Sequence, residues 1–314
     1  MRIFVITGAG ISAESGIPTF RGKDGYWRNL DPAKLATPEA FARDPRLVWE
    51  WYRERRQRIR DAKPNAAHAA ITRLSMLTDE FLLLTQNVDD LHTRGGLPKE
   101  KMVQIHGDIF VTRCSRCDFS QTEPAYGYSL LFMSASSENA TIQKLDRFKR
   151  SSSDEMEHRE LLLCPECNTL MRPGVVWFGE QLDPRKIDIV EEFLAQGACD
   201  LVLVIGTTAL FGYIADWAVR ARGENGELVE VNPDETPLSS FATKCIREPA
   251  AIALPRLVAE IVGQPHRVPE MLQGGSPRDE SVSPRRSEVP PANETGSRHS
   301  ECFRRYGRHG DYQG

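Results

Sequence analysis

The fold is decided by RIFVITGAGISAESGIPTFR, residues 2–21. Its residues 3–6 are an apolar, β-rich run without a charge, which is typical of a central parallel strand covered on both faces. The chain then turns at residues 8–10, Gly-Ala-Gly, where glycines let the backbone bend and let a phosphate approach the amide groups. Together with Ala13 they fit the loose pattern G-x-G-x-x-G/A that follows a strand in dinucleotide-binding proteins. Alone, that pattern leaves open both a tight structural turn and a nucleotide site.

The residues that follow the turn favour the nucleotide site. Hydroxyls, an aromatic ring and a guanidinium crowd into this loop, and a simple turn needs none of them: Ser12, Ser15, Phe20 and Arg21. The stretch GAGISAESGIPTFRG, residues 8–22, resembles the cofactor-binding signature of the sirtuins, the NAD-dependent protein lysine deacylases. Further family motifs follow in the family's order, and the resemblance extends over residues 1–263.

Composition sets limits on the class of protein. The chain has 314 residues, a hydrophobic content of 40%, a charged content of 27% and a net charge of −4. These values are ordinary for a soluble globular protein and do not suggest one that binds nucleic acid, which is usually strongly basic. The sequence contains neither a long apolar membrane span nor the pattern of a signal peptide, so we expect a cytoplasmic protein that does not bind membranes.

Apolar runs alternate with helical stretches along the chain. Strands are predicted at residues 3–6, 80–85, 103–107, 200–205 and 227–231, and helices at 45–62, 64–77, 184–196, 213–222 and 255–262. This alternation predicts the α/β class, with a Rossmann-like parallel sheet and helices on both faces. We expect residues 264–314, which are rich in Gly, Pro, Ser and Arg, to form a disordered tail.

Seven cysteines are present, and four of them form two C-x-x-C pairs, Cys114 with Cys117 and Cys164 with Cys167. Two such pairs can complete a closed tetrahedron around one structural zinc ion, and this reading is favoured over disulfides or redox pairs in a reducing compartment. His158, between the pairs, is not needed as a ligand. The pairs place a small zinc module at residues 111–171, inserted into a Rossmann-like NAD-binding domain that comprises residues 1–110 and 172–263. The local Arg113 and Arg116 are too few for a nucleic-acid surface.

The resemblance to sirtuins implies a reaction and a set of residues for it. The acyl group of an acylated lysine is transferred to the ribose of NAD and nicotinamide leaves, which gives free lysine, nicotinamide and O-acyl-ADP-ribose. His106, in QIHGD, stands at the catalytic histidine of the family, and the reaction needs a base with a pKa near neutrality. Gln86, Asn87 and Asp89, in TQNVD, stand where the family holds the nicotinamide and its ribose, and we expect Asn87 and Asp89 to take part in catalysis with His106.

The resemblance also implies the remaining contacts with NAD. We expect the pyrophosphate near Gly8, Ala9, Gly10 and Ser12, with Phe20 and Arg21 at the ribose. After the strand at 200–205, Gly206, Thr207 and Thr208 fit the G-T-S turn of the family at the adenosine ribose, with Thr208 in place of serine. Asn232 and Ala250 are expected on the adenine side. The stretch that follows the turn, LFGYIAD at residues 210–216, lacks the proline expected in this family.

The predicted helix at residues 45–62 carries a pair of residues that indicates which acyl group the protein removes. Tyr52 and Arg55 lie three residues apart and so share a helix face, where a phenol and a guanidinium can hold a carboxylate. This Y-x-x-R matches the desuccinylase and demalonylase branch of the sirtuins, and Ala36 matches the small residue of its pocket. From spacing alone, Arg55 is more readily read as one of five solvated arginines on the helix. The extended stretch Val176, Trp177, Phe178 and Gly179 is predicted to receive the acylated peptide as an added strand.

Other functions stay open at this level. The same cleft suits a mono-ADP-ribosyltransferase, and a zinc-bearing NAD sensor without catalysis would not need His106. An NAD-dependent oxidoreductase is disfavoured because no ribose-binding acid ends a second strand. The expected partners are acylated lysine side chains of proteins, and the expected state is a monomer.

Overall fold

The computed structural model describes residues 1–19, 31–122 and 161–263. The predictions made for Phe20, Arg21, most of the insert between the cysteine pairs and the tail lie outside these residues. All described residues belong to one compact unit, Met1–Pro265. Within this part of the chain, no helix is both long enough and apolar enough to cross a bilayer.

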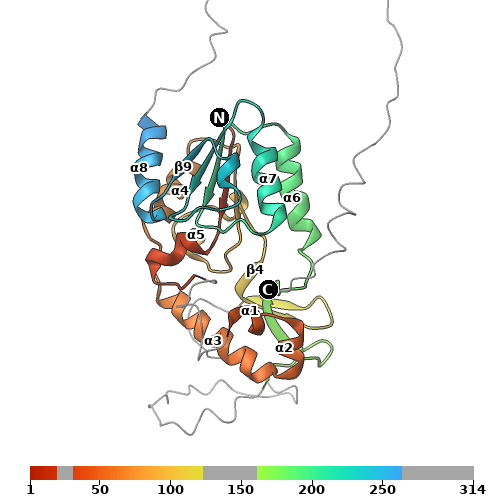
Figure 1. The fold of residues 1–314 in the computed structure, drawn as a ribbon. Coiled ribbons are helices and arrows are strands. Elements are labelled where there is room, and N and C mark those ends of the chain that lie inside the picture. The colour runs from red at the N-terminus through yellow and green to blue at the C-terminus, as the bar shows by residue number, and fades with distance from the viewer. Residues whose placement is uncertain (20–30, 123–160, 264–314) are drawn as a thin grey trace, which may run out of the picture. The chain divides into compact units, whose positions relative to one another are not determined.

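A six-stranded parallel sheet forms the centre of the fold, in the order β3-β2-β1-β7-β8-β9 (Figure 1). Its strands are β1 (Ile3–Thr7), β2 (Phe81–Thr85), β3 (Met102–Gln104), β7 (Leu201–Ile205), β8 (Glu227–Val231) and β9 (Lys244–Ile246). Counted along the chain, this is the 3-2-1-4-5-6 order of Rossmann folds, so the predicted fold class is confirmed. The order reverses between β1 and β7, and ligands bind at such a reversal in open α/β sheets.

Helices cover both faces of the sheet because alternate residues of each strand point to opposite sides. Ile3 and Val5 of β1 pack in one core with α4 (Ala66–Ser75) and α8 (Ala250–Gly263). Phe4 and Ile6 pack in a second core with α6 (Pro184–Ala195) and α7 (Gly212–Arg222). Figure 1 shows these two pairs of helices on either side of the sheet.

A second, three-stranded sheet and a group of helices share a third core. The sheet has the order β5-β4-β6, with antiparallel pairing. Its strands are β4 (Gly107–Cys114), β5 (Ser120–Thr122) and β6 (Met171–Val175), and the helices beside it are α1 (Pro32–Leu35), α2 (Pro38–Arg43) and α3 (Pro45–Asp61). Buried residues of α3, such as Trp49 and Tyr52, pack with Ile109 of β4 and Val175 of β6. The short elements are α5 (Leu91–Arg94) and the 3₁₀ helices η1 (Ala9–Ser15), η3 (Lys99–Lys101) and η4 (Ser239–Phe241).

Two predicted elements differ from the structure by more than two residues at one end. The strand predicted at 103–107 ends at Gln104, because the chain leaves the parallel sheet at His106 and enters β4 at Gly107, whose φ is +92°. The helix predicted to begin at Pro255 begins at Ala250 and contains that proline. Its buried stripe of Ala250, Ala253, Leu254, Leu257 and Val258 packs on the sheet, and this packing outweighs the hydrogen bond that proline removes.

Candidate active site and metal centre

Two turns meet where the strand order reverses. The Gly10 amide donates to the Gly206 carbonyl oxygen at 2.8 Å, and Gly206 has a left-handed φ of +58°. A Cβ on Gly206 would lie 2.5 Å from the Ile11 amide nitrogen, and a Cβ on Gly10 would lie 2.7 Å from the Cα of Gly206. Both positions therefore need glycine. The predicted phosphate turn and the turn after β7 form one structural unit.

Side chains that follow β2 join this unit through hydrogen bonds. Gln86 Nε2 donates to Thr207 Oγ1 at 2.9 Å, which connects the end of β2 to the turn after β7. Ser12 Oγ donates to Asp89 Oδ2 at 3.0 Å and accepts from Asn87 Nδ2 at 3.2 Å. Burial raises the pKa of Asp89, while hydrogen bonds from the Leu91 amide and from Ser12 act in the opposite direction. The predicted residues of this group thus lie together.

His106 lies between the two sheets, at the same edge. Its Nδ1 is 2.9 Å from the carbonyl oxygen of Gln86, and its Nε2 is 2.7 Å from the hydroxyl of Tyr213. A carbonyl oxygen only accepts, so Nδ1 carries the proton and Nε2 has the free lone pair. Burial lowers the pKa of His106, the Gln86 carbonyl opposes this shift, and the charge of Lys186 adds to it. The imidazole is therefore neutral near pH 7 and able to accept a proton.

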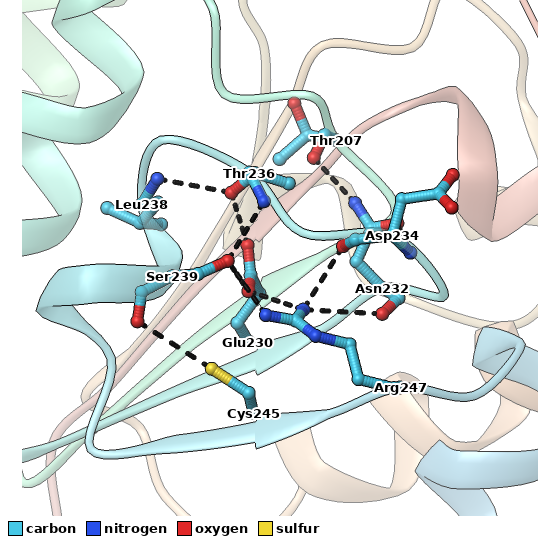
Figure 2. Close-up of polar contacts among 9 residues, drawn as sticks. All are labelled: Thr207, Glu230, Asn232, Asp234, Thr236, Leu238, Ser239, Cys245 and Arg247. Carbon is cyan, nitrogen blue, oxygen red and sulfur yellow. Dashed lines mark hydrogen bonds and ion pairs between the residues drawn. The ribbon is translucent and has the colours of Figure 1, made fainter.

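The predicted adenosine side is a polar network at the ends of β8 and β9 (Figure 2). Asn232 Nδ2 donates to the Thr207 carbonyl oxygen at 2.8 Å. Arg247 pairs with the buried Glu230 at 2.6 Å and donates to the carbonyl oxygens of Asn232 and Asp234 at 3.4 and 3.1 Å. Arg247 thereby fixes the backbone that carries Asn232.

The other two residues expected on this side differ in exposure. Thr208 is exposed beside Thr207, whereas Ala250 is buried in the core at the start of α8. Thr208 thus lies at the surface of the turn after β7, and the side chain of Ala250 packs in the core.

The predicted acyl-binding pair lies on α3. Tyr52 is buried, and its hydroxyl accepts a hydrogen bond from Trp177 Nε1 at 3.0 Å. The guanidinium carbon of Arg55 lies 5.6 Å from the ring centre of Tyr52 and 4.7 Å from that of Trp51. Burial lowers the pKa of Arg55, and the interactions with Tyr52 and with the carboxylate of Asp89 oppose the shift. This links Arg55 electrostatically to the group around Ser12.

The segment after β6 is the one predicted to receive the acylated peptide, and backbone hydrogen bonds fix its position. The Val176 amide donates to the His106 carbonyl oxygen at 2.8 Å, and the Phe178 amide donates to that of Ala36 at 2.9 Å. The Trp177 amide donates to Glu180 Oε2 at 2.8 Å, and Gly179 has a φ of +83°. Backbone hydrogen bonds thus join this segment to His106 and to Ala36 at the end of α1.

A partly buried ion pair positions Trp177 in this segment. Glu180 pairs with Arg172, whose Nη2 lies 2.9 Å from Glu180 Oε2. The guanidinium carbon of Arg172 lies 3.4 Å from the ring centre of Trp177. Because Trp177 donates to the hydroxyl of Tyr52, the ion pair also positions the predicted acyl-binding phenol.

The four predicted metal ligands come together at the end of β4. The Sγ atoms of Cys114 and Cys167 are 3.4 Å apart, and those of Cys117 and Cys164 are 3.6 Å apart. All four sulfurs lie within 4.8 Å of one another. A zinc ion with Zn–S bonds of about 2.3 Å separates its sulfurs by about 3.8 Å, so the cluster fits one structural zinc ion. With four thiolates the site is closed to substrate.

Sequence analysis missed the hydrogen bond between Tyr213 and His106 and the one between Trp177 and Tyr52. The only signal for the former was the absence of proline in residues 210–216. The latter joins residues that are 125 positions apart and left no local pattern.

Comparisons with known proteins identify the family that this chain resembles. The model of the Sir2 family matches residues 8–211. An NAD-dependent protein deacylase of Pyrococcus abyssi is 40% identical over 255 residues, which are 81% of this chain and 91% of the relative. NAD-dependent protein deacylase 1 of Archaeoglobus fulgidus is 38% identical over 82% of this chain and 92% of its own length.

Solved structures described as Sir2 proteins also resemble this chain. One described as a Sir2 homologue–NAD complex has a TM-score of 0.68 at 36% identity, covering 83% of this chain and 89% of that one. Another, described as Sir2–p53 peptide–NAD⁺, has a TM-score of 0.63 at 27% identity, covering 83% and 93%.

Proposed function

The chain belongs to the Sir2 family of NAD-dependent protein deacylases, and we propose that it removes succinyl and malonyl groups, as well as acetyl groups, from protein lysines. The observation that supports this choice is the pair of Tyr52 and Arg55 on α3. The phenol is held by Trp177, and the guanidinium lies beside the phenol ring. Succinyl and malonyl groups end in a carboxylate, which such a pair can bind.

The proposed base is His106. Its Nδ1–H is held by the Gln86 carbonyl, so Nε2 is the nitrogen that accepts the proton of a ribose hydroxyl. NAD supplies the electrophilic ribose carbon and nicotinamide as the leaving group. Asn87 and Asp89, joined through Ser12, would orient the ribose and the nicotinamide amide. After the proton transfer, the protonated imidazole is stabilised by the same carbonyl.

The rest of the cosubstrate is assigned to the two joined turns. Gly8, Ala9, Gly10 and Ser12 would contact the pyrophosphate, and Gly206, Thr207, Thr208, Asn232 and Ala250 would surround the adenosine. This is supported by the glycine contacts that only a bare backbone permits and by the hydrogen bond from Asn232 to the Thr207 carbonyl. Phe20 and Arg21 are assigned to the ribose on the resemblance of their motif alone.

The acylated lysine would enter between the sheets. Ala36 leaves room beside the acyl chain, and its carbonyl oxygen accepts from the Phe178 amide. The segment from Val176 to Gly179 would align the peptide through its backbone. This arrangement predicts little preference for the residues that flank the lysine, because backbone contacts carry no side-chain information.

The test is the substitution Arg55→Met, assayed with succinyl-, malonyl- and acetyl-lysine versions of one peptide. A charge-assisted, bidentate contact contributes about 2–3 kcal/mol, so kcat/KM for the two acidic acyl groups should fall by about 30- to 150-fold. Deacetylation should change by less than about threefold, because an acetyl group has no carboxylate.

Arg58→Met is the matched control. Arg58 lies on the same helix, its side chain is half exposed, and it pairs with Glu54. Its loss should leave all three activities unchanged. If Arg55→Met lowered desuccinylation and deacetylation by the same factor, the assignment of Arg55 to the acyl carboxylate would be wrong.

A further inference from the structure

The nitrogen of His106 that must accept a proton in the proposed reaction already has a hydrogen-bond partner within the protein. Nε2 lies 2.7 Å from the hydroxyl of Tyr213, and Nδ1 is fixed by the Gln86 carbonyl. Since Nδ1 carries the hydrogen, the phenol must donate to Nε2. This contact occupies the lone pair that the proposed reaction requires.

Tyr213 is not a substitute base. Burial raises the pKa of its phenol, so the hydroxyl stays protonated over the working pH range. The ring itself is held independently of this hydrogen bond. It is stacked on Phe211 at 5.5 Å between ring centres, and its edge packs against Trp217 at 5.3 Å. Removing the hydroxyl alone therefore leaves the packing of the ring in place.

We propose that Tyr213 gates the ribose site: its hydroxyl takes the place on His106 that a ribose hydroxyl of the cosubstrate must take, and binding of that ribose displaces it. The inference rests on the proposed role of His106. Both ligands offer the same group to Nε2, an O–H donor, and one lone pair accepts one of them at a time.

The backbone before Tyr213 provides a route for this displacement. The turn after β7 carries Ala209 with a left-handed φ of +50°, and Thr207 in the same turn bonds both Gln86 and Asn232. Gly212 is exposed, and no atom lies within 4 Å of the position that its Cβ would occupy. Tyr213, which bonds His106, thus lies five residues after Thr208 of the turn that is assigned to the adenosine, and the exposed Gly212 precedes it in the sequence.

Tyr213→Phe tests the gate by calorimetric titration of the full chain with three ligands. NAD and ADP-ribose contain the second ribose, whereas ADP lacks it and serves as the control. Losing one hydrogen bond that competes with the ligand should tighten NAD and ADP-ribose by about 2- to 10-fold and leave ADP unchanged. At saturating NAD, kcat should stay the same or rise, so the gain appears in KM.

Three outcomes would overturn the gate. The first is equal affinity of both proteins for all three ligands, and the second is an equal gain for ADP. The third is a lower kcat with unchanged affinity, which would make Tyr213 a positioning residue for the imidazole. A failure of the proposed function is seen separately, because then the wild-type chain would not bind NAD or a His106→Ala variant would retain turnover. A thermal melt of each variant checks that it is folded.

Discussion

Acidification should destabilise this fold through a pair of buried histidines, one in α4 and one in α5. His68 of α4 is fully buried and His92 of α5 is 2% exposed, and their ring centres are 4.9 Å apart. His68 Nε2 and His92 Nδ1 have no hydrogen-bond partner among the described residues. Burial, together with the charge of Arg94, lowers the pKa of His68 to about 4, and burial with the nearby His68 lowers the pKa of His92 well below 6.5.

The sign follows from proton linkage. Below the ordinary histidine pKa of about 6.5, both histidines bind protons in the unfolded chain but stay neutral in the folded protein. The free energy of unfolding therefore falls as the pH falls. For His68, a change from pH 7 to pH 5 costs about 2 kcal/mol, and the loss continues down to about pH 4. His92 destabilises the fold in the same direction over this interval, because its pKa in the folded protein is also lowered below 6.5.

Urea unfolding, followed by tryptophan fluorescence at pH 7 and pH 5, measures this loss. The variants His68→Asn and His92→Asn remove one titrating ring each and supply the control for the remaining ionisable groups. Each variant should be less stable than the wild type at pH 7, but its free energy of unfolding should fall less between the two pH values, by about 2 kcal/mol less for His68→Asn. A pH dependence that stays the same in both variants would refute the reasoning.

Three further perturbations test the two turns and the metal centre. Cys164→Ser removes one of four sulfurs that lie within 4.8 Å of one another, and it should abolish the binding of one zinc per chain, as measured by metal analysis and a lowered Tm. Gly206→Ala places a Cβ 2.5 Å from the Ile11 amide at a φ of +58°, and it should cost about 2 kcal/mol in stability and weaken NAD binding, as seen by calorimetry. Arg247→Met leaves the carboxylate of Glu230 buried without its ion pair, and it should cost about 2 kcal/mol and raise the KM for NAD.

Much of the central sheet can be predicted from the sequence because its strands are covered on both faces. Such strands are continuous apolar runs, as at Ile3–Thr7 and Leu201–Ile205, and no other local structure explains them as well. The polar residues that follow them must then meet at one edge, since all six strands are parallel. For this reason the sequence alone predicts that Gln86, Asn87 and Asp89 lie near the glycine turn.

The third core could not be predicted in this way. Trp49 and Tyr52 of α3 are buried against β4 and β6, but the residues of these strands are separated by the long insert between the cysteine pairs. An amphipathic helix shows which of its faces is buried and does not show against which partner. The arginine-rich face of α3 made Tyr52 and Arg55 ambiguous for the same reason, and the hydrogen bond from Trp177 to Tyr52 supplies what the helix pattern lacks.

The contact between Tyr213 and His106 marks a different limit. It joins residues 107 positions apart, and it depends on a turn in which Gly206 and Ala209 both have positive φ. The positive φ at position 206 can be predicted from the sequence because the residue is glycine. The positive φ of Ala209 cannot, because a non-glycine residue adopts this conformation only where the surrounding fold requires it. Residues 210–216 lack the proline that the family motif leads one to expect, and a proline at position 213 would have no hydroxyl to offer the imidazole. The departure from the motif is therefore where we expect this chain to differ from its relatives in how tightly it binds the ribose half of NAD.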